Sequence, residues 1–300
     1  MKSNKRFLGP LLVMLAGVFW GSMGIFVRTM TSWGFSSIQV TAVRLTIGAV
    51  LFLLLLLIRS PKDLRIRLRD VPLFLALGVI SILFFTICYF TAITMLPLST
   101  AAILLYTSPI WVMLMSVLFF HEKFTSRKLL ALAMAFGGCI LVSGISGGSI
   151  SLAGLFFGLG SGFGYALYSI FGTVALRRYS PFNVTTYAFL IAAVGIQFIC
   201  PPTELLPLFA AASPPSKAVL FAIVMALVTA VTPYLLYTLG LARVEASRAA
   251  ILATVEPLVA TLFGVLVFSE PLTLSSLLGI LLILAAIVLL NTKSPLKQEG

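Results

Sequence analysis

The stretch AAILATVEP at residues 249–257 has a counterpart, AAILLYTSP, at residues 101–109. Aligned without gaps, residues 89–130 and 237–278 are identical at 15 of 42 positions, which indicates an internal repeat. Each stretch ends in a proline that lies deep inside an apolar run. The two stretches therefore predict a chain of two related halves, each with a helix interrupted at the same point.

The composition is that of an integral membrane protein. The chain has 60% hydrophobic and 9% charged residues and a mean hydropathy of +1.15, whereas soluble domains have roughly 25% charged residues. A spanning helix needs about 20 residues, so 300 residues with short connections allow roughly ten spans and no soluble catalytic domain. The net charge of +12 would suit a nucleic acid only if the basic residues shared one folded surface, but they lie between apolar runs. We expect the lipid bilayer as partner and no nucleic acid.

Apolar lengths and helix breakers predict an all-α integral membrane protein with ten transmembrane helices. The first apolar run could be a signal peptide, but its length and the lack of a small-residue cleavage site favour an uncleaved span. Residues 59–70 and 201–216 are predicted to form the longer connections. The spans are predicted near residues 8–30, 36–58, 71–94, 97–120, 128–145, 152–176, 181–200, 217–240, 246–268 and 273–291.

The basic residues predict the orientation. If the N-terminus is cytoplasmic, 17 of the 20 lysines and arginines lie on the cytoplasmic side, as the positive-inside rule requires. Only Arg28, Arg44 and Lys217 fall elsewhere. We therefore expect a multi-pass protein with both termini in the cytoplasm.

The two copies of the repeat are separated by five spans, so the second copy must be inverted in the membrane. We predict two inverted five-helix repeats at residues 1–148 and 149–300. Transporters commonly have this architecture, with a substrate site near the midplane that interrupted helices mark. Pro109 and Pro257 match that description, because a proline removes a backbone donor and breaks the helix. A proline kink that only shapes packing is the alternative.

Two charged residues lie inside predicted spans. Glu256 stands where the first copy has Ser108, and a carboxyl group in an apolar segment is costly enough to indicate function. We interpret Glu256 as a group that couples transport to protons; the alternative is a permanently protonated structural residue. Arg44 is expected to pair with Glu256, to bind an anionic substrate carboxylate, or to extend to the membrane surface.

Six aromatic residues within the predicted spans are candidates for a cavity wall. Indole and phenol rings combine an apolar wall with a polar group, and they attract amines by cation–π contact. The alternative is that they form interfacial belts or pack against lipid. The six are Trp20, Tyr89, Tyr165, Tyr168, Tyr234 and Tyr237.

The segment His121–Lys123 has a histidine beside a carboxylate, but an acid–base role is disfavoured because no nucleophile or further ligand lies nearby in sequence. Glu122 recurs as Glu270, which suggests helix termination or gating. Thr125 and Thr273 are predicted N-caps of the following helices.

Cysteine and glycine patterns predict no metal or cofactor. Cys88, Cys139 and Cys200 have no metal-ligand spacing and are read as buried thiols. Glycines at 158–164 imitate a nucleotide-binding loop, but they lie within a predicted span and suit close helix packing.

The chain resembles the drug/metabolite transporter superfamily, in the branch of EamA-type ten-helix transporters. This resemblance implies a secondary transporter that works by alternating access, commonly an exporter of amino acids, related metabolites or toxic compounds, in the bacterial inner membrane. Span seven departs from symmetry, because residues 185–188 have no counterpart of Arg44. The resemblance is carried by residues 19–22, Arg44, Tyr89, Phe90, Ser99, Pro109, Glu122, residues 165–169, Ala246, Ser247, Glu256, Pro257 and Glu270.

Two other classes are weaker alternatives. A membrane-embedded lipid-modifying enzyme should have clustered acidic or histidine ligands, whereas this chain has eight acidic residues, no Asp-rich pair and no HExxH motif. An accessory membrane scaffold would not need an inverted repeat or charges within its spans. We therefore expect a transporter and not an enzyme.

Overall fold

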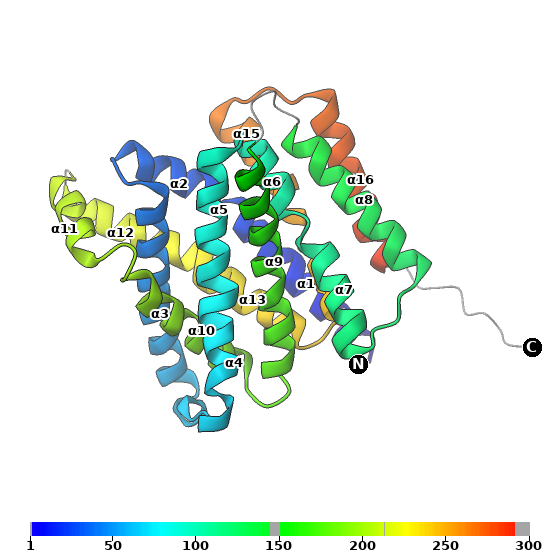
Figure 1. Cartoon of the computed structure of the whole chain (residues 1–300), viewed down its shortest axis with the longest axis horizontal. Coiled ribbons are helices and arrows are strands. Elements are labelled where there is room, and N and C mark those ends of the chain that lie inside the picture. Colours follow the sequence, from blue (N-terminus) through cyan, green and yellow to red (C-terminus); the bar gives the residue numbers. More distant parts are fainter. Residues whose placement is uncertain (1, 145–150, 213, 292–300) are drawn as a thin grey trace, which may run out of the picture.

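The computed structural model describes residues 2–144, 151–212 and 214–291 (Figure 1). Within these residues the chain is helical and contains no strand. Nine of the described helical stretches are long and apolar enough to cross a membrane. A tenth, α10 (Pro181–Ile196), is apolar but has 16 residues, about 24 Å at 1.5 Å per residue, against a hydrocarbon core about 30 Å thick. The chain is therefore a multi-pass membrane protein whose described residues form nine long helical spans and one short one.

The helices follow the predicted order, with some spans divided into segments. Spans one to five are α1 (Lys2–Gly21) with α2 (Met23–Ser32), α3 (Ser37–Arg59), α4 (Val71–Leu75) continued by the π-helical η3 (Ala76–Leu83) and α5 (Phe84–Met95), α6 (Leu98–Leu105) with α7 (Ser108–Phe120), and α8 (Ser126–Ser143). Spans six to ten are α9 (Leu152–Ala175), α10, α12 (Pro215–Ala226) continued by the π-helical η4 (Leu227–Val231) and α13 (Thr232–Leu241), α14 (Ala246–Leu252) with α15 (Val255–Phe268), and α16 (Leu274–Asn291).

The connections contain more structure than the sequence predicts. The first long connection forms two short 3₁₀ helices, η1 (Pro61–Leu64) and η2 (Leu68–Asp70), and the second contains α11 (Pro202–Ala211). Span seven is shorter than predicted because α10 ends at Ile196, where a turn follows. The predicted repeat boundary at residues 148 and 149 lies outside the described residues and stays a prediction.

The helix–helix contacts are related by a pseudo-two-fold symmetry, because interchanging the two halves reproduces the same pairs of packed spans. Helix α8 packs against α16 and α3 packs against α10, so spans five and two each contact their own counterparts. Helix α5 packs against α9, and α13 packs against α1, which is the same contact made from the opposite half. Figure 1 shows α8 and α16 side by side at one edge of the bundle. The fold therefore consists of two inverted five-helix repeats, as predicted.

Spans four and nine are interrupted just before their repeated prolines. Helices α6 and α7, like α14 and α15, are separated by two residues. Pro109 and Pro257 lie in the first turn of α7 and α15, where a helix does not need the missing N–H. The hydroxyls of Thr107 and Thr254 each donate to a carbonyl three residues earlier, at 2.6 Å. The interruptions therefore keep nearby backbone carbonyls bonded inside the bundle.

The two broken spans also end alike. His121 and Ser269 adopt left-handed backbone conformations, with φ of 54° and 55°. The next N–H group donates to the carbonyl six residues earlier, at 3.2 Å after α7 and 3.1 Å after α15, which ends both helices. The hydroxyls of Thr125 and Thr273 accept N–H groups at 3.2 and 3.1 Å and cap α8 and α16. The two predicted N-caps are confirmed, and His121 has a helix-ending role.

Two glycines bring spans one and six against the interruptions of the opposite half. A Cβ at Gly17 in α1 would lie 3.0 Å from a carbonyl oxygen of the α14–α15 interruption. A Cβ at Gly162 in α9 would lie 2.6 Å from a carbonyl oxygen near the end of α6. Only glycine permits both approaches. Trp20 and Tyr165 each follow three residues later, so these two rings occupy equivalent positions near the centre.

Candidate functional site

A cavity of about 440 Å³ lies between the two repeats. It occupies the half of the bundle where α2 ends and α3 begins; we call this side the distal end and the opposite side the proximal end. The exposed side chains of Arg28 and Leu98 lie at its rim. Trp20 and Tyr234, which are 7% and 5% exposed, line its deepest part. The volume is within the range of small-molecule sites.

Arg44 projects from α3 into this cavity. A capping box at Ser36 and Gln39 begins α3, and Arg44 follows within the distal half of the span. The side chain is 6% exposed, and its Nη1 donates to Met23 Sδ at 3.1 Å. Its buried Nε has no hydrogen-bond partner among the described residues. Because an unmet buried donor on a charged group is costly, a ligand acceptor would satisfy it.

Glu256 lies in the first turn of α15, directly after the interruption. Its N–H donates to the Ala253 carbonyl at 3.0 Å, and its carboxyl group lines the cavity together with Tyr165. Arg44 and Glu256 attract each other electrostatically. In the described part of the chain, however, no ion pair of 4.0 Å or less joins them. Both charges therefore remain available to a ligand between them.

The wall of the cavity is aromatic. The Trp20 ring packs edge-on against Tyr165 and Tyr234, with centroid distances of 6.1 and 5.2 Å. Phe85 packs against Tyr165 at 5.4 Å and stacks with Tyr89 at 6.2 Å. These rings provide an apolar surface, phenol hydroxyls and faces that attract cations. The wall therefore suits an amphipathic ligand.

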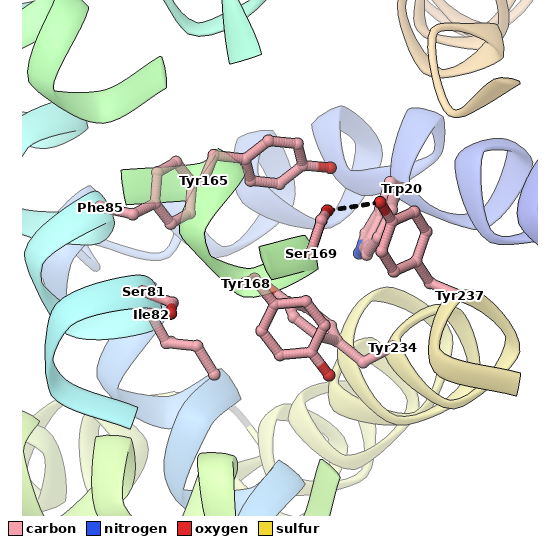
Figure 2. A pocket seen from close by; sticks show the side chains of 9 residues that line it. All are labelled: Trp20, Ser81, Ile82, Phe85, Tyr165, Tyr168, Ser169, Tyr234 and Tyr237. Atoms are coloured by element: carbon pink, nitrogen blue, oxygen red, sulfur yellow. Dashed lines mark hydrogen bonds between the residues drawn. The ribbon is translucent and has the colours of Figure 1, made fainter. Parts of the chain in front are cut away.

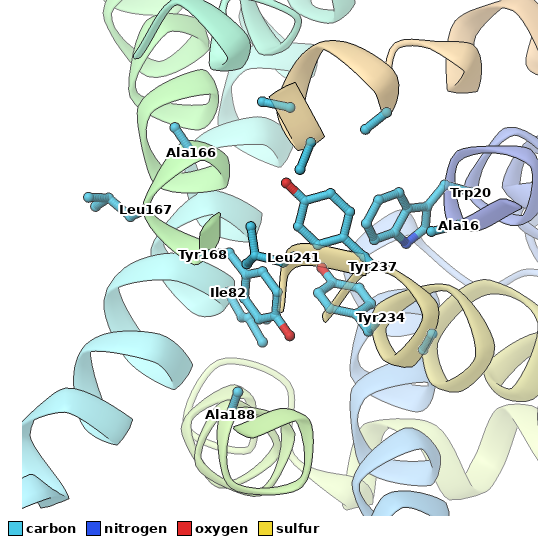
Figure 3. Packing of buried hydrophobic residues seen from close by; sticks show 14 of the residues in the cluster. Ala16, Trp20, Ile82, Ala166, Leu167, Tyr168, Ala188, Tyr234, Tyr237 and Leu241 are labelled. Atoms are coloured by element: carbon cyan, nitrogen blue, oxygen red, sulfur yellow. The ribbon is translucent and has the colours of Figure 1, made fainter. Parts of the chain in front are cut away.

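A hydrogen-bonded layer closes the cavity toward the proximal end. The hydroxyl of Tyr168 bonds to that of Thr238 at 2.9 Å, and the hydroxyl of Ser169 bonds to that of Tyr237 at 2.7 Å. Figure 2 shows the Ser169–Tyr237 bond beside Trp20, and Figure 3 shows both tyrosines within the buried apolar core. We call these four residues of α9 and α13 the proximal layer. Their burial separates the cavity from the proximal end, so the cavity opens toward the distal side.

The structure divides the predicted site residues into three groups. Tyr168 and Tyr237 lie in the proximal layer rather than on the cavity wall. Pro109 and Pro257 are buried at the helix interruptions. The cavity wall contains the other six, which are Trp20, Arg44, Tyr89, Tyr165, Tyr234 and Glu256.

Some wall residues were not singled out by the sequence. Tyr106 lines the cavity from the α6–α7 interruption, so its place in the repeated stretch is a signal that points to it. Met23 and Phe85 also line the cavity. They carry no comparable signal, because a membrane helix is apolar on every side and its pattern does not reveal the inward face.

The described residues contain no group of three or more His, Cys, Asp and Glu side chains that could hold a metal ion. Cys88, Cys139 and Cys200 are buried free thiols, as predicted. The cavity offers the guanidinium of Arg44, that of Arg28 at its rim, the carboxyl group of Glu256 and aromatic surfaces. This arrangement can bind and orient a small molecule.

Ten spans in two inverted repeats, with a one-sided polar and aromatic cavity between them, define a membrane transporter. The sequence model of the EamA-like transporter family matches residues 7–144 and again residues 152–292. The chain belongs to the EamA-like transporter family.

Relatives and a solved structure agree with this assignment. An uncharacterized transporter of Archaeoglobus fulgidus is 32% identical over 282 residues, covering 94% of this chain and 95% of that protein. The pseudopaline exporter CntI of Pseudomonas aeruginosa is 28% identical over 191 residues, covering 62% of this chain and 64% of the exporter. A crystal structure with 16% identity aligns with a TM-score of 0.80 over 95% of this chain and 97% of the other, which shows the same fold.

Proposed function

We propose that the chain is a secondary transporter that moves small amphipathic metabolites by alternating access. One observation carries the proposal: a single cavity between the inverted repeats combines Arg44, Glu256 and aromatic rings. A carboxylate on the substrate would meet Arg44, and an amine would meet Glu256 and the ring faces. The proposed cargo is an amino acid, a related metabolite or a toxic compound of this chemistry.

The proposed direction is export across the cell inner membrane. Arg59 ends α3, Arg178 follows α9, Lys128 lies in the first turn of α8 and Arg243 follows α13, all at the proximal end. By the positive-inside rule this end is cytoplasmic, with both termini on that side. The cavity then opens to the outside, where an exporter releases its substrate. The similarity to a protein named as an exporter supports this direction.

Glu256 is the proposed proton-coupling group. Its carboxyl group lines a cavity that opens to the distal side, so it can exchange protons with the medium there. Glu256→Gln keeps the size and hydrogen bonding of the side chain but removes its ionisation. We expect this variant to insert normally and to lose transport driven by a pH gradient. Undiminished gradient-driven transport would rule out Glu256 as the coupling group.

Counterflow in proteoliposomes tests the function itself. We expect the purified protein to exchange at least one member of a panel of amino acids, amines and aromatic compounds. Arg44→Met should weaken this exchange, whereas Glu204→Gln, which changes an exposed glutamate on α11 outside the cavity, should not. Lipid modification without any counterflow would instead favour a membrane-embedded enzyme. Absence of both activities would favour an accessory scaffold.

A further inference from the structure

Glu122 and Glu270 occupy equivalent positions in the two repeats but have different surroundings. Glu122 follows α7 near the proximal end, and Glu270 follows α15 near the distal end. The Glu122 side chain is 9% exposed, whereas that of Glu270 is 46% exposed. When an inverted-repeat transporter changes its open side, the two repeats exchange conformations. The contacts of Glu122 therefore show what Glu270 would do in the opposite conformation.

Glu122 joins the end of span four to the start of span nine. Its Oε1 accepts the N–H of Ala246 at 3.0 Å, and its Oε2 accepts the hydroxyl of Ser247. Lys128 Nζ donates to the same carboxyl group at 3.2 Å. The bonds to Ala246 and Ser247 cross between the repeats at the end where the cavity is closed, and Lys128 neutralises the glutamate from its own repeat.

Glu270 has a different partner at the open end. It pairs with Arg28 at 2.6 Å, and the Arg28 guanidinium also lies 4.2 Å from the centre of the Phe268 ring. By the repeat alignment, the counterparts of Ala246 and Ser247 are Leu98 and Ser99, at the start of α6. Among the described residues α7 packs against α14, whereas the equivalent pair, α15 and α6, makes no packing contact of comparable extent. Because an exposed ion pair stabilises little, Glu270 can leave Arg28 at small cost.

The residues of the closed proximal layer also have counterparts at the open distal end. The equivalence of Trp20 and Tyr165 aligns α1 and α2 with α9, and the repeat alignment pairs α5 with α13. A Cβ at Gly24 would meet no atom within 4 Å, which shows that this position faces open space. By this alignment the counterparts of the proximal layer are Met23, Gly24, Tyr89 and Phe90, all of which line the open cavity.

We propose that Glu122 and Glu270 are alternating gate residues. In the distal-closed conformation Glu270 accepts the N–H of Leu98 and the hydroxyl of Ser99, and Glu122 releases the start of α14. The counterparts of the proximal layer then pack together and close the distal end. The proposal rests on the proposed alternating-access function and names the residues that hold each end shut. Both glutamates are positioning residues, because neither lines the cavity.

Paired cysteines test the exchange directly. In a background with the three native cysteines changed to alanine, a short bis-methanethiosulfonate reagent should join E122C to S247C in the resting protein, because it replaces the reach that a cysteine lacks relative to glutamate. The same reagent should join S99C to E270C during transport, and each cross-link should block transport until it is reduced. Absence of the second cross-link in a chain that still transports would overturn the gate proposal alone. Absence of transport by the uncross-linked wild-type chain would overturn the proposed function instead.

A second measurement follows the conformational equilibrium without cross-links. Gly24→Cys in the same background places a thiol in the cavity, where a membrane-impermeant reagent can label it. A cysteine is close in size to Ser169, the counterpart of Gly24 in the other repeat, so it should fit when the distal end closes. Glu122→Gln weakens the closed proximal end, so the ratio of distal-open to distal-closed molecules should fall by about tenfold. Glu270→Gln should raise this ratio, and Glu204→Gln should leave it unchanged. Shifts of Glu122→Gln and Glu270→Gln in the same direction, or no shift, would overturn the assignment.

Discussion

Replacing Arg44 with methionine is expected to weaken substrate binding without destabilising the protein. The guanidinium is buried, and among the described residues its Nε is unbonded and its Nη1 donates to a neutral sulfur acceptor at 3.1 Å. A hydrogen bond to a charged group contributes about 1.5–3 kcal/mol, so its loss should raise Kd by roughly 10- to 160-fold. Methionine is an unbranched apolar side chain that can fill the vacated space. Because it also removes a buried charge, Tm should hold or rise.

The test combines calorimetric binding of a substrate found by counterflow with thermal unfolding of the same purified sample. Arg243→Met is the matched control, because Arg243 is exposed beyond α13 and outside the cavity. It should leave both Kd and Tm unchanged. A fall in Tm of more than about 4 °C for Arg44→Met, with Kd unchanged, would refute the reasoning and make Arg44 a structural residue.

Three further predictions concern the carboxyl group of Glu256, the close contact of Gly162 with the α6–α7 interruption, and the Trp20 ring of the cavity wall. Glu256→Gln should lose pH-gradient-driven transport but retain substrate counterflow, measured in the same proteoliposomes. Gly162→Val should lower stability by about 1–3 kcal/mol in thermal unfolding, because its Cβ would lie 2.5 Å from Thr107 Oγ1. The control Gly137→Ala, whose Cβ meets nothing within 4 Å, should raise stability by about 0.5–1 kcal/mol. Trp20→Ala should weaken binding of aromatic substrates more than that of aliphatic ones.

Each of these expectations has a clear contradiction. Equal loss of gradient-driven transport and counterflow in Glu256→Gln would indicate a binding role without coupling. A Gly162→Val protein as stable as Gly137→Ala would remove the close contact between α9 and α6. Equal losses for aromatic and aliphatic substrates in Trp20→Ala would show that the ring does not select its ligand.

The fold was predictable because it depends on coarse properties of the sequence. Apolar length and basic connections predict the spans, and the alignment of residues 89–130 with 237–278 predicts the inverted repeat. The shortening of span seven was not predictable, because the apolar run continues past Ile196 while the helix does not. The contacts of Asp70 with Arg178 at 2.8 Å and with Tyr179 at 2.7 Å depend on tertiary packing that no local pattern indicates.

Site residues were predictable from the sequence where a charged side chain lies in an apolar span. Arg44 and Glu256 stand out because charges are rare in apolar spans, and both line the cavity. Tyrosines do not stand out in this way, since rings on the wall and rings in the proximal layer occur in similar apolar contexts. Placing Tyr89 on the wall and Tyr168 beneath it requires the rotation of each helix, which only the packed structure supplies.

The central claim is that the cavity between the repeats is the transport path. The most direct measurement is counterflow by Gly24→Cys in the cysteine-free background, before and after reaction with a bulky membrane-impermeant thiol reagent. The account predicts that modification blocks counterflow and that added substrate slows the modification. Complete modification with undiminished counterflow would contradict it.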